Sequence, residues 1–165
     1  GRIVLDAAVL MLTDGRTAAR SIAEGAPSEL VLFDLALDYG SAPRIALAKG
    51  ASTSGTALAA AAGLIQALGK IASPLPDTPA LVVLRIVARL ANEAAWAVED
   101  GIAEAAAVDT ALRAGANYPR GPLAWADALG PARVLAALAA LAETYGEARY
   151  RPSARLREMA SITQA

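Results

Sequence analysis

Short apolar runs separated by turn signals make up much of the first half of the chain. Buried strands are expected at residues 7–12, 30–35, 44–48 and 71–75. Helical stretches lie between them at residues 16–24 and 52–68, and hydroxyl side chains at the start of the second can cap it. We therefore expect the order strand, helix, strand, strand, helix, strand. The strands should lie beside helices and not in hairpins, as is typical of an α/β layer.

From Ala80 onward the apolar residues recur with the period of a helix. The longest helix is predicted to start there and to extend over about 18 to 20 residues. Further helices are predicted up to Gly115, at residues 123–129, from Pro131 to Gly146 and at residues 153–159. Prolines and glycines in the stretch 113–130 set the angle between helices. With a hinge at residues 77–79, the chain divides into an α/β segment, residues 1–77, and a helical domain, residues 78–165.

The composition excludes several kinds of chemistry. The 165 residues include no Cys and no His, which removes disulfides, thiol and imidazole catalysis, and zinc sites built on these residues. A net charge of −1 argues against a nucleic-acid partner. The uncharged stretch 51–69 is interrupted by polar residues, so we expect a buried helix and no membrane span. No signal peptide is visible at Gly1, so a cytoplasmic setting is the default expectation.

Two features resemble catalytic motifs, but each is weak evidence for catalysis. The stretch from Gly63 to Lys70 has the wrong glycine spacing for a phosphate-binding loop, and Ile71 stands where a Ser or Thr would hold magnesium. The dinucleotide fingerprint G-x-G-x-x-G is absent from the sequence. Asp34 and Asp38 follow a strand, and we expect loop and capping roles for them in preference to paired acid–base work.

Arginine clusters leave two alternatives open. One cluster comprises Arg149, Arg151, Arg155 and Arg157. It is either a solvated face balanced by Glu147 and Glu158 or an anion site for a phosphate-bearing ligand. Arg85 and Arg89 share a helical face with Glu93, which favours an ion-pair ladder over a ligand contact.

Several ordered motifs carry a family resemblance. They are Asn92-Glu93-Ala94, Val108-Asp109-Thr110-Ala111, Gly115 and the run from Asn117 to Leu123. Together they resemble the C-terminal helical domain of 3-hydroxyacyl-CoA dehydrogenases. The runs AWADALG and YGEARYRPS look like the end of long bacterial dehydrogenases of phenylacetate degradation, which act on 3-hydroxyadipyl-CoA or related thioesters. Residues 8–76 look like the degenerate Rossmann-type half-domain that precedes the second helical domain of those proteins.

The resemblance implies a parent enzyme of acyl-CoA and fatty acid metabolism. That parent would oxidise a 3-hydroxyacyl-CoA to the 3-ketoacyl-CoA, with NAD as hydride acceptor and a His as base. This chain departs from the pattern, because Ala80 stands where the family has Gly and Leu84 where it has a functional Asn. A leucine side chain can neither accept a proton nor hold a carbonyl group by a hydrogen bond. We therefore expect this chain alone to be inactive, with no catalytic, cofactor-binding or metal-binding residue and no bound NAD.

The resemblance leaves a supporting role for the helical domain. Residues implied as substrate-binding are Asn92, Asn117, Tyr118, Pro119 and Arg120, although packing and turn formation also explain them. The expected roles are homodimer formation and, with acyl-CoA as the ligand of the intact enzyme, one wall of its cleft. The alternative is a purely structural helical module for dimerisation or interaction that binds no ligand.

Overall fold

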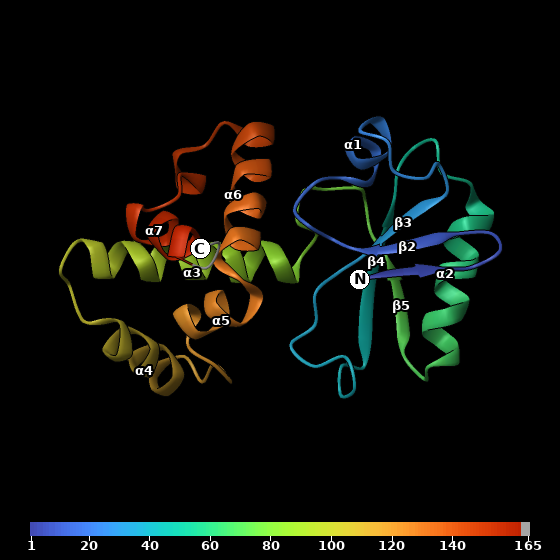
Figure 1. Cartoon of the computed structure of the whole chain (residues 1–165). Helices are drawn as coiled ribbons and strands as arrows, with labels where there is room; N and C mark the ends of the chain where they lie inside the picture. Colours follow the sequence, from blue (N-terminus) through green and yellow to red (C-terminus); the bar gives the residue numbers. More distant parts are fainter. Residues whose placement is uncertain (163–165) are drawn as a thin grey trace. The chain divides into compact units, whose positions relative to one another are not determined.

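A computed structural model describes residues 1–162 as two compact units (Figure 1). The first comprises Gly1–Leu84, and the second begins at Arg85. The strands of the first unit are β1 (Arg2–Val4), β2 (Val9–Leu12), β3 (Leu30–Phe33), β4 (Arg44–Lys49) and β5 (Ile71–Pro74). Its helices are α1 (Ala18–Ala23) and α2 (Gly55–Ala67). The boundary after residue 77 that we expect from the sequence stays a prediction.

The five strands form one mixed sheet in the order β1-β2-β3-β4-β5. Pairs β2–β3 and β4–β5 are parallel, and helices α1 and α2 provide their crossover connections. Pairs β1–β2 and β3–β4 are antiparallel and are joined directly, so the expectation that no strands form hairpins is wrong. A hydrogen bond of 2.8 Å from the Leu5 N–H to the Ala8 carbonyl closes the β1–β2 turn. Strand β1 has only three residues, all exposed, and therefore carries little apolar pattern.

Alternating residues of the central strands face opposite sides of the sheet, and each side has its own helix. On one side, Leu10, Val31 and Leu47 pack in a cluster with Ala57 and Ala61 of α2. The cluster on the other side includes Leu30, Leu32 and Ala48 of the sheet and Ala18 of α1. This period of two is what a sheet buried on both faces requires. The α/β layer predicted from the sequence is confirmed.

Two aspartates of the first unit accept hydrogen bonds from backbone N–H groups where helices begin. Asp77 accepts hydrogen bonds from the Ala18 and Ala19 N–H groups, at 2.7 and 2.9 Å, where α1 begins. Asp34 is 2% exposed and accepts from the N–H groups of residues 82, 83 and 84 at 2.9, 2.7 and 3.3 Å. Asp38 accepts from Gly40 and Ser41 in an exposed turn. The capping and turn roles predicted for Asp34 and Asp38 are confirmed.

Helices make up the second unit. They are α3 (Val83–Glu99), α4 (Ala105–Gly115), α5 (Pro122–Leu129), α6 (Pro131–Tyr145), the 3-10 helix η1 (Ala148–Tyr150) and α7 (Ala154–Ile162). The predicted start of the longest helix at Ala80 is wrong, because Ala80 and Leu81 adopt left-handed backbone angles with φ of 59° and 47°. Helix α3 therefore has 17 residues and begins at the groups that Asp34 caps.

Apolar side chains of α6 and α7 form a large part of the core of the second unit. Val134, Leu138 and Leu141 of α6 are fully buried, as is Leu156 of α7. Helices α5 and α6 meet at an angle of 101°. That pair has the length and composition of a broken membrane span, but within residues 1–162 no single helix is long and apolar enough to cross a membrane.

Candidate functional site

The turn between α4 and α5 carries four of the predicted site residues, and Asp109 holds it in place. Its carboxylate accepts hydrogen bonds from the Leu123 and Ala124 N–H groups, at 2.9 and 3.0 Å, and so caps α5. Gly121 lies so close that a Cβ atom built on it would be 2.1 Å from the Asp109 Cγ atom. Asn117 adopts a φ of 54°, which Asn tolerates better than most residues. The backbone of the turn is therefore fixed before any ligand arrives.

The side chains of this turn are open to solvent. Asn117, Pro119 and Arg120 are exposed, and Tyr118 is half-buried. The Tyr118 ring lies against Trp125, with ring centroids 5.8 Å apart, and Trp125 is only 6% exposed. The turn thus offers an amide, an aromatic edge and a guanidinium group to a ligand.

Asn92 occupies a different setting from the turn. It is 1% exposed, and its amide nitrogen donates to the Arg151 carbonyl at 2.9 Å while its oxygen accepts from the Ser153 N–H at 2.9 Å. Ser153 in turn caps α7 through the Leu156 N–H at 3.0 Å. Asn92 therefore positions the backbone at residues 151–153, and in the described part of the chain no hydrogen bond joins it to the turn.

Leu84 stands where the family resemblance places a functional Asn. Its side chain is fully buried and apolar. The sequence contains no His to act as a base. Among residues 1–162, no three His, Cys, Asp or Glu side chains are grouped so that they could hold a metal ion. The local chemistry here is packing, since no side chain at this point can take or give a proton.

Two of the four arginines near the C-terminal helix form ion pairs with acidic side chains. Arg149 forms an ion pair with Glu147, and Arg155 forms one with Glu158 at 3.6 Å. The Arg151 guanidinium lies 5.0 Å from the centroid of the Trp96 ring. These contacts confirm that Glu147 and Glu158 offset part of the positive charge.

Arg85 and Arg89 do not form the predicted ladder with Glu93. Arg85 donates to the Tyr145 hydroxyl at 2.6 Å and lies over the Tyr145 ring, while Arg89 lies over the Tyr150 ring. In the described chain no ion pair joins either arginine to Glu93, so the prediction of an ion-pair ladder is wrong. The i, i+4 spacing permits such pairs, but aromatic rings distant in sequence occupy these guanidinium groups instead.

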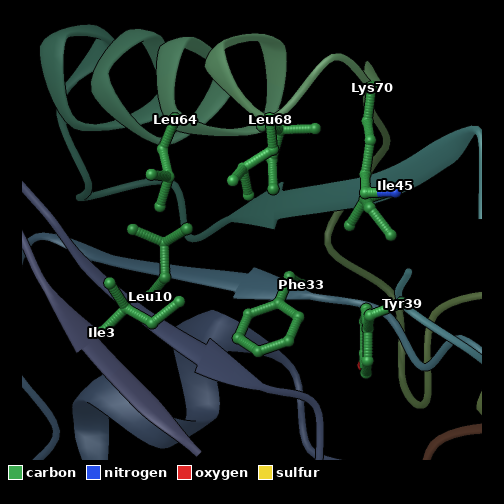
Figure 2. Close-up of a pocket in the computed structure, with 9 residues that line it drawn as sticks. Ile3, Leu10, Phe33, Tyr39, Ile45, Leu64, Leu68 and Lys70 are labelled. Carbon is green, nitrogen blue, oxygen red and sulfur yellow. The ribbon is translucent and has the colours of Figure 1, made fainter.

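An apolar hollow of about 290 Å³ lies between the sheet and α2 in the first unit (Figure 2). Its walls are Ile3, Leu10, Phe33, Tyr39, Ile45, Leu64, Ile65, Leu68 and Lys70. Leu64 and Leu68 point from α2 toward Leu10 and Phe33 (Figure 2). The Lys70 ammonium donates to the carbonyls of Gly40 and Ala42, at 3.0 and 2.8 Å. Sequence reasoning missed this hollow, because it depends on how far α2 extends across the sheet.

Comparison with known families assigns both units. A family model described as the 3-hydroxybutyryl-CoA dehydrogenase reduced Rossmann-fold domain matches residues 10–79. A model described as the 3-hydroxyacyl-CoA dehydrogenase C-terminal domain matches residues 81–165, more than half of the chain. The chain belongs to the 3-hydroxyacyl-CoA dehydrogenase family. The predicted fold class, a reduced Rossmann-like layer followed by the helical domain of these dehydrogenases, is confirmed.

Individual dehydrogenases of this family share substantial sequence with the chain. The 3-hydroxyadipyl-CoA dehydrogenase of Escherichia coli K12 is 44% identical over 98 residues, which are 59% of this chain and 21% of that protein. The probable 3-hydroxybutyryl-CoA dehydrogenase of Bacillus subtilis is 36% identical over 95 residues, 58% of this chain and 33% of that protein. The chain thus spans a fifth to a third of the length of these curated relatives.

Solved structures of dehydrogenases agree with the assignment along nearly the whole chain. The 3-hydroxybutyryl-CoA dehydrogenase of Escherichia coli K12 gives a TM-score of 0.88 at 35% identity and covers 99% of this chain and 34% of that one. The (S)-3-hydroxybutyryl-CoA dehydrogenase of Ralstonia eutropha gives 0.77 at 28% identity, over 93% of this chain and 55% of that one. Nearly the whole chain is therefore similar to a part of each of these dehydrogenase structures.

Proposed function

We propose that the chain is the non-catalytic C-terminal part of a longer NAD-dependent 3-hydroxyacyl-CoA dehydrogenase. The observation that carries this proposal is Leu84, fully buried and apolar where the family resemblance places a functional Asn. The short coverage of the relatives supports a longer parent. In that parent, another portion would bind NAD and supply the His that removes the hydroxyl proton. This chain would bind no cofactor.

The substrate of the parent, on this proposal, is a 3-hydroxyacyl-CoA of phenylacetate degradation. The 44% identity to a 3-hydroxyadipyl-CoA dehydrogenase supports that choice. Such a pathway enzyme would work in the cytoplasm.

We assign the turn at residues 117–120 as a wall of the acyl-CoA cleft. Its exposed Arg120 and half-buried Tyr118 can contact a ligand without rearrangement, because Asp109 already fixes the backbone. Preorganisation of this kind lowers the entropy lost on binding. Asn92 would contribute through the backbone that it holds at residues 151–153. The alanine-rich helices would provide the surface of a homodimer.

Thermal unfolding with and without acetoacetyl-CoA tests the ligand role. Ligand at about 100 times its Kd stabilises a protein by about 2.7 kcal/mol, which raises the Tm of a chain this long by roughly 5–11 °C. Tyr118→Ala and Arg120→Ala should reduce that shift. Arg2→Ala, on exposed β1, is the matched control and should leave it unchanged. A Tm that acetoacetyl-CoA does not move would contradict the cleft role.

The alternative is a purely structural module for dimerisation or interaction. Its support is that hydrogen bonds and packing already explain Asn92 and Tyr118 without any ligand. A dimeric mass in analytical ultracentrifugation combined with an unmoved Tm would favour this alternative. A monomeric mass at all accessible concentrations would contradict the homodimer in either version.

A further inference from the structure

Two arginines on α3 have no acidic partner in the part of the chain that the structure describes. Arg85 and Arg89 are one helical turn apart, and among residues 1–162 neither forms an ion pair with an Asp or Glu side chain. Arg85 makes a hydrogen bond to the Tyr145 hydroxyl. The Arg89 side chain makes none within the described chain and lies 5.8 Å from the Tyr150 ring centroid. Like charges at this spacing repel, and no carboxylate of the described chain pairs with either guanidinium group to offset that repulsion.

Both guanidinium groups also leave hydrogen-bonding capacity unused. The Nε atoms of Arg85 and Arg89 are buried, and among the described residues they have no acceptor. Buried donors without partners are rare and costly in folded proteins. Each guanidinium carries five N–H donors in a fixed fork, and the stacked tyrosine rings restrict its movement. The tyrosine rings therefore hold both guanidinium groups in position, and the terminal N–H groups of Arg89 have no hydrogen-bond acceptor within residues 1–162.

A hollow of about 220 Å³ opens beside these two side chains. It is lined by Arg85, Ile86, Arg89, Leu90 and Glu93. A single water needs only about 10–15 Å³, so the hollow has room for a polyatomic ligand. The lining carries two guanidinium groups and one carboxylate, so its net charge is positive. Ile86 is 53% exposed and gives the hollow an apolar rim.

We propose that the Arg85–Arg89 hollow binds a phosphate or pyrophosphate group of a small-molecule ligand. Such an oxyanion has three or more oxygens and can accept from two guanidinium forks at once, whereas a carboxylate has two oxygens. The negative charge of Glu93 repels the bound anion and lowers the affinity of the site for it. The inference does not depend on the dehydrogenase role of the parent, since the binding groups all belong to this chain.

Isothermal titration of the 165-residue protein with inorganic pyrophosphate at low ionic strength tests the proposal. We expect saturable binding that Arg89→Gln weakens by about tenfold or more, since hydrogen bonds to charged groups are lost. Glu93→Gln should tighten binding, because a like charge is removed. Arg157→Gln, on exposed α7, is the matched control and should leave the affinity unchanged. Arg89→Lys keeps the charge and should bind more tightly than Arg89→Gln while folding as the wild type does.

Coenzyme A distinguishes the two sources of the anion. Competition between coenzyme A and pyrophosphate would support the site and assign it to a coenzyme phosphate. Binding of pyrophosphate without coenzyme A would support a free oxyanion site. Equal pyrophosphate affinity in the wild type and Arg89→Gln would overturn the proposal, as would no saturable binding. An acidic peptide that binds where pyrophosphate does not would also overturn it, in favour of a protein partner.

The outcome of the pyrophosphate titration can be distinguished from the outcome of the acetoacetyl-CoA test. The cleft test uses acetoacetyl-CoA with changes at Tyr118 and Arg120, while the present test uses pyrophosphate with changes at Arg89 and Glu93. Pyrophosphate binding that depends on Arg89 would stand even if acetoacetyl-CoA failed to move the Tm.

Discussion

Replacing Asp34 with alanine removes one buried carboxylate that four backbone N–H groups share. Three of these groups start α3, and the fourth is the Leu35 N–H at 2.8 Å. Replacing a capping residue at the start of a helix with alanine typically lowers protein stability by about 1 kcal/mol. Leaving a buried N–H without an acceptor costs about 1–3 kcal/mol, and Leu84 is fully buried. The residues around the Val82 N–H are more exposed, so water can replace the carboxylate there.

We therefore expect Asp34→Ala to lower the free energy of unfolding by about 2–4 kcal/mol. For a chain of this length the Tm should fall by roughly 4–16 °C. Urea and thermal unfolding followed by circular dichroism would measure both quantities.

Asp38→Ala is the matched control for this prediction. Its carboxylate also accepts two backbone N–H groups, from Gly40 and Ser41, but in an exposed turn. Water can replace these bonds, so we expect a change within about 0.5 kcal/mol. Equal losses in Asp34→Ala and Asp38→Ala would refute the reasoning that burial makes Asp34 the more important cap.

Three further changes test the turn and one helix cap by the same unfolding measurements. Asn117→Val should lower stability by about 1–2 kcal/mol, because a β-branched residue is strained at a φ of 54°, while Asn117→Gly should not. Gly121→Ala should cost about 1–3 kcal/mol, since the new Cβ would displace the Asp109 carboxylate from α5. The pKa of Glu29 is lowered by hydrogen bonds from the Ser54 hydroxyl and N–H. Its contribution to stability is present above about pH 4–5 and is lost as the pH falls through the folded-state pKa.

Controls for these changes are available in α2. Within residues 1–162, the methyl group of Gly63→Ala meets no atom within 4 Å beyond its chain neighbours and its own helix backbone, so the change should stabilise the helix by about 0.5–1 kcal/mol. A loss like that of Gly121→Ala would contradict the steric argument. Ser54→Ala removes the hydroxyl that donates to Glu29 and leaves the backbone N–H that also donates to it. The Tm difference between wild type and Ser54→Ala should therefore narrow as the solution is acidified from pH 6 to about pH 3. A constant difference would contradict the assigned pKa shift.

Much of the fold is predictable from the sequence, because local patterns such as apolar runs and capping residues indicate the same elements that burial stabilises in the folded chain. The four longer strands have apolar runs bounded by turns, and Ser54 caps α2 through the Ala57 N–H at 3.1 Å, as its residue type predicts. Strand β1 was not predictable, because its exposed residues lack an apolar pattern and its pairing with β2 depends on the turn. The left-handed angles at Ala80 were also hidden, since alanine favours a helix in sequence and the tertiary structure overrides that preference.

Some features of the candidate sites could likewise be predicted from the sequence and others could not. The turn at residues 117–120 could be found from its prolines, glycine and motif order, and Asp109 explains physically why it is fixed. The partners of Arg85 and Arg89 could not be found, because Tyr145 and Tyr150 reach the arginines across more than fifty residues of sequence. The helical spacing of Arg85, Arg89 and Glu93 gave the wrong partners, since spacing within one helix carries no information about neighbouring helices.

The central claim is that this chain supports dehydrogenase function without performing the chemistry. The most direct test adds the purified 165-residue protein to NADH and acetoacetyl-CoA and follows the near-ultraviolet absorbance of NADH. We predict no oxidation above the rate without protein, because the buried, apolar Leu84 cannot replace the functional Asn of the family and the sequence has no His to act as the base. Oxidation of NADH in proportion to the amount of this protein would contradict the account.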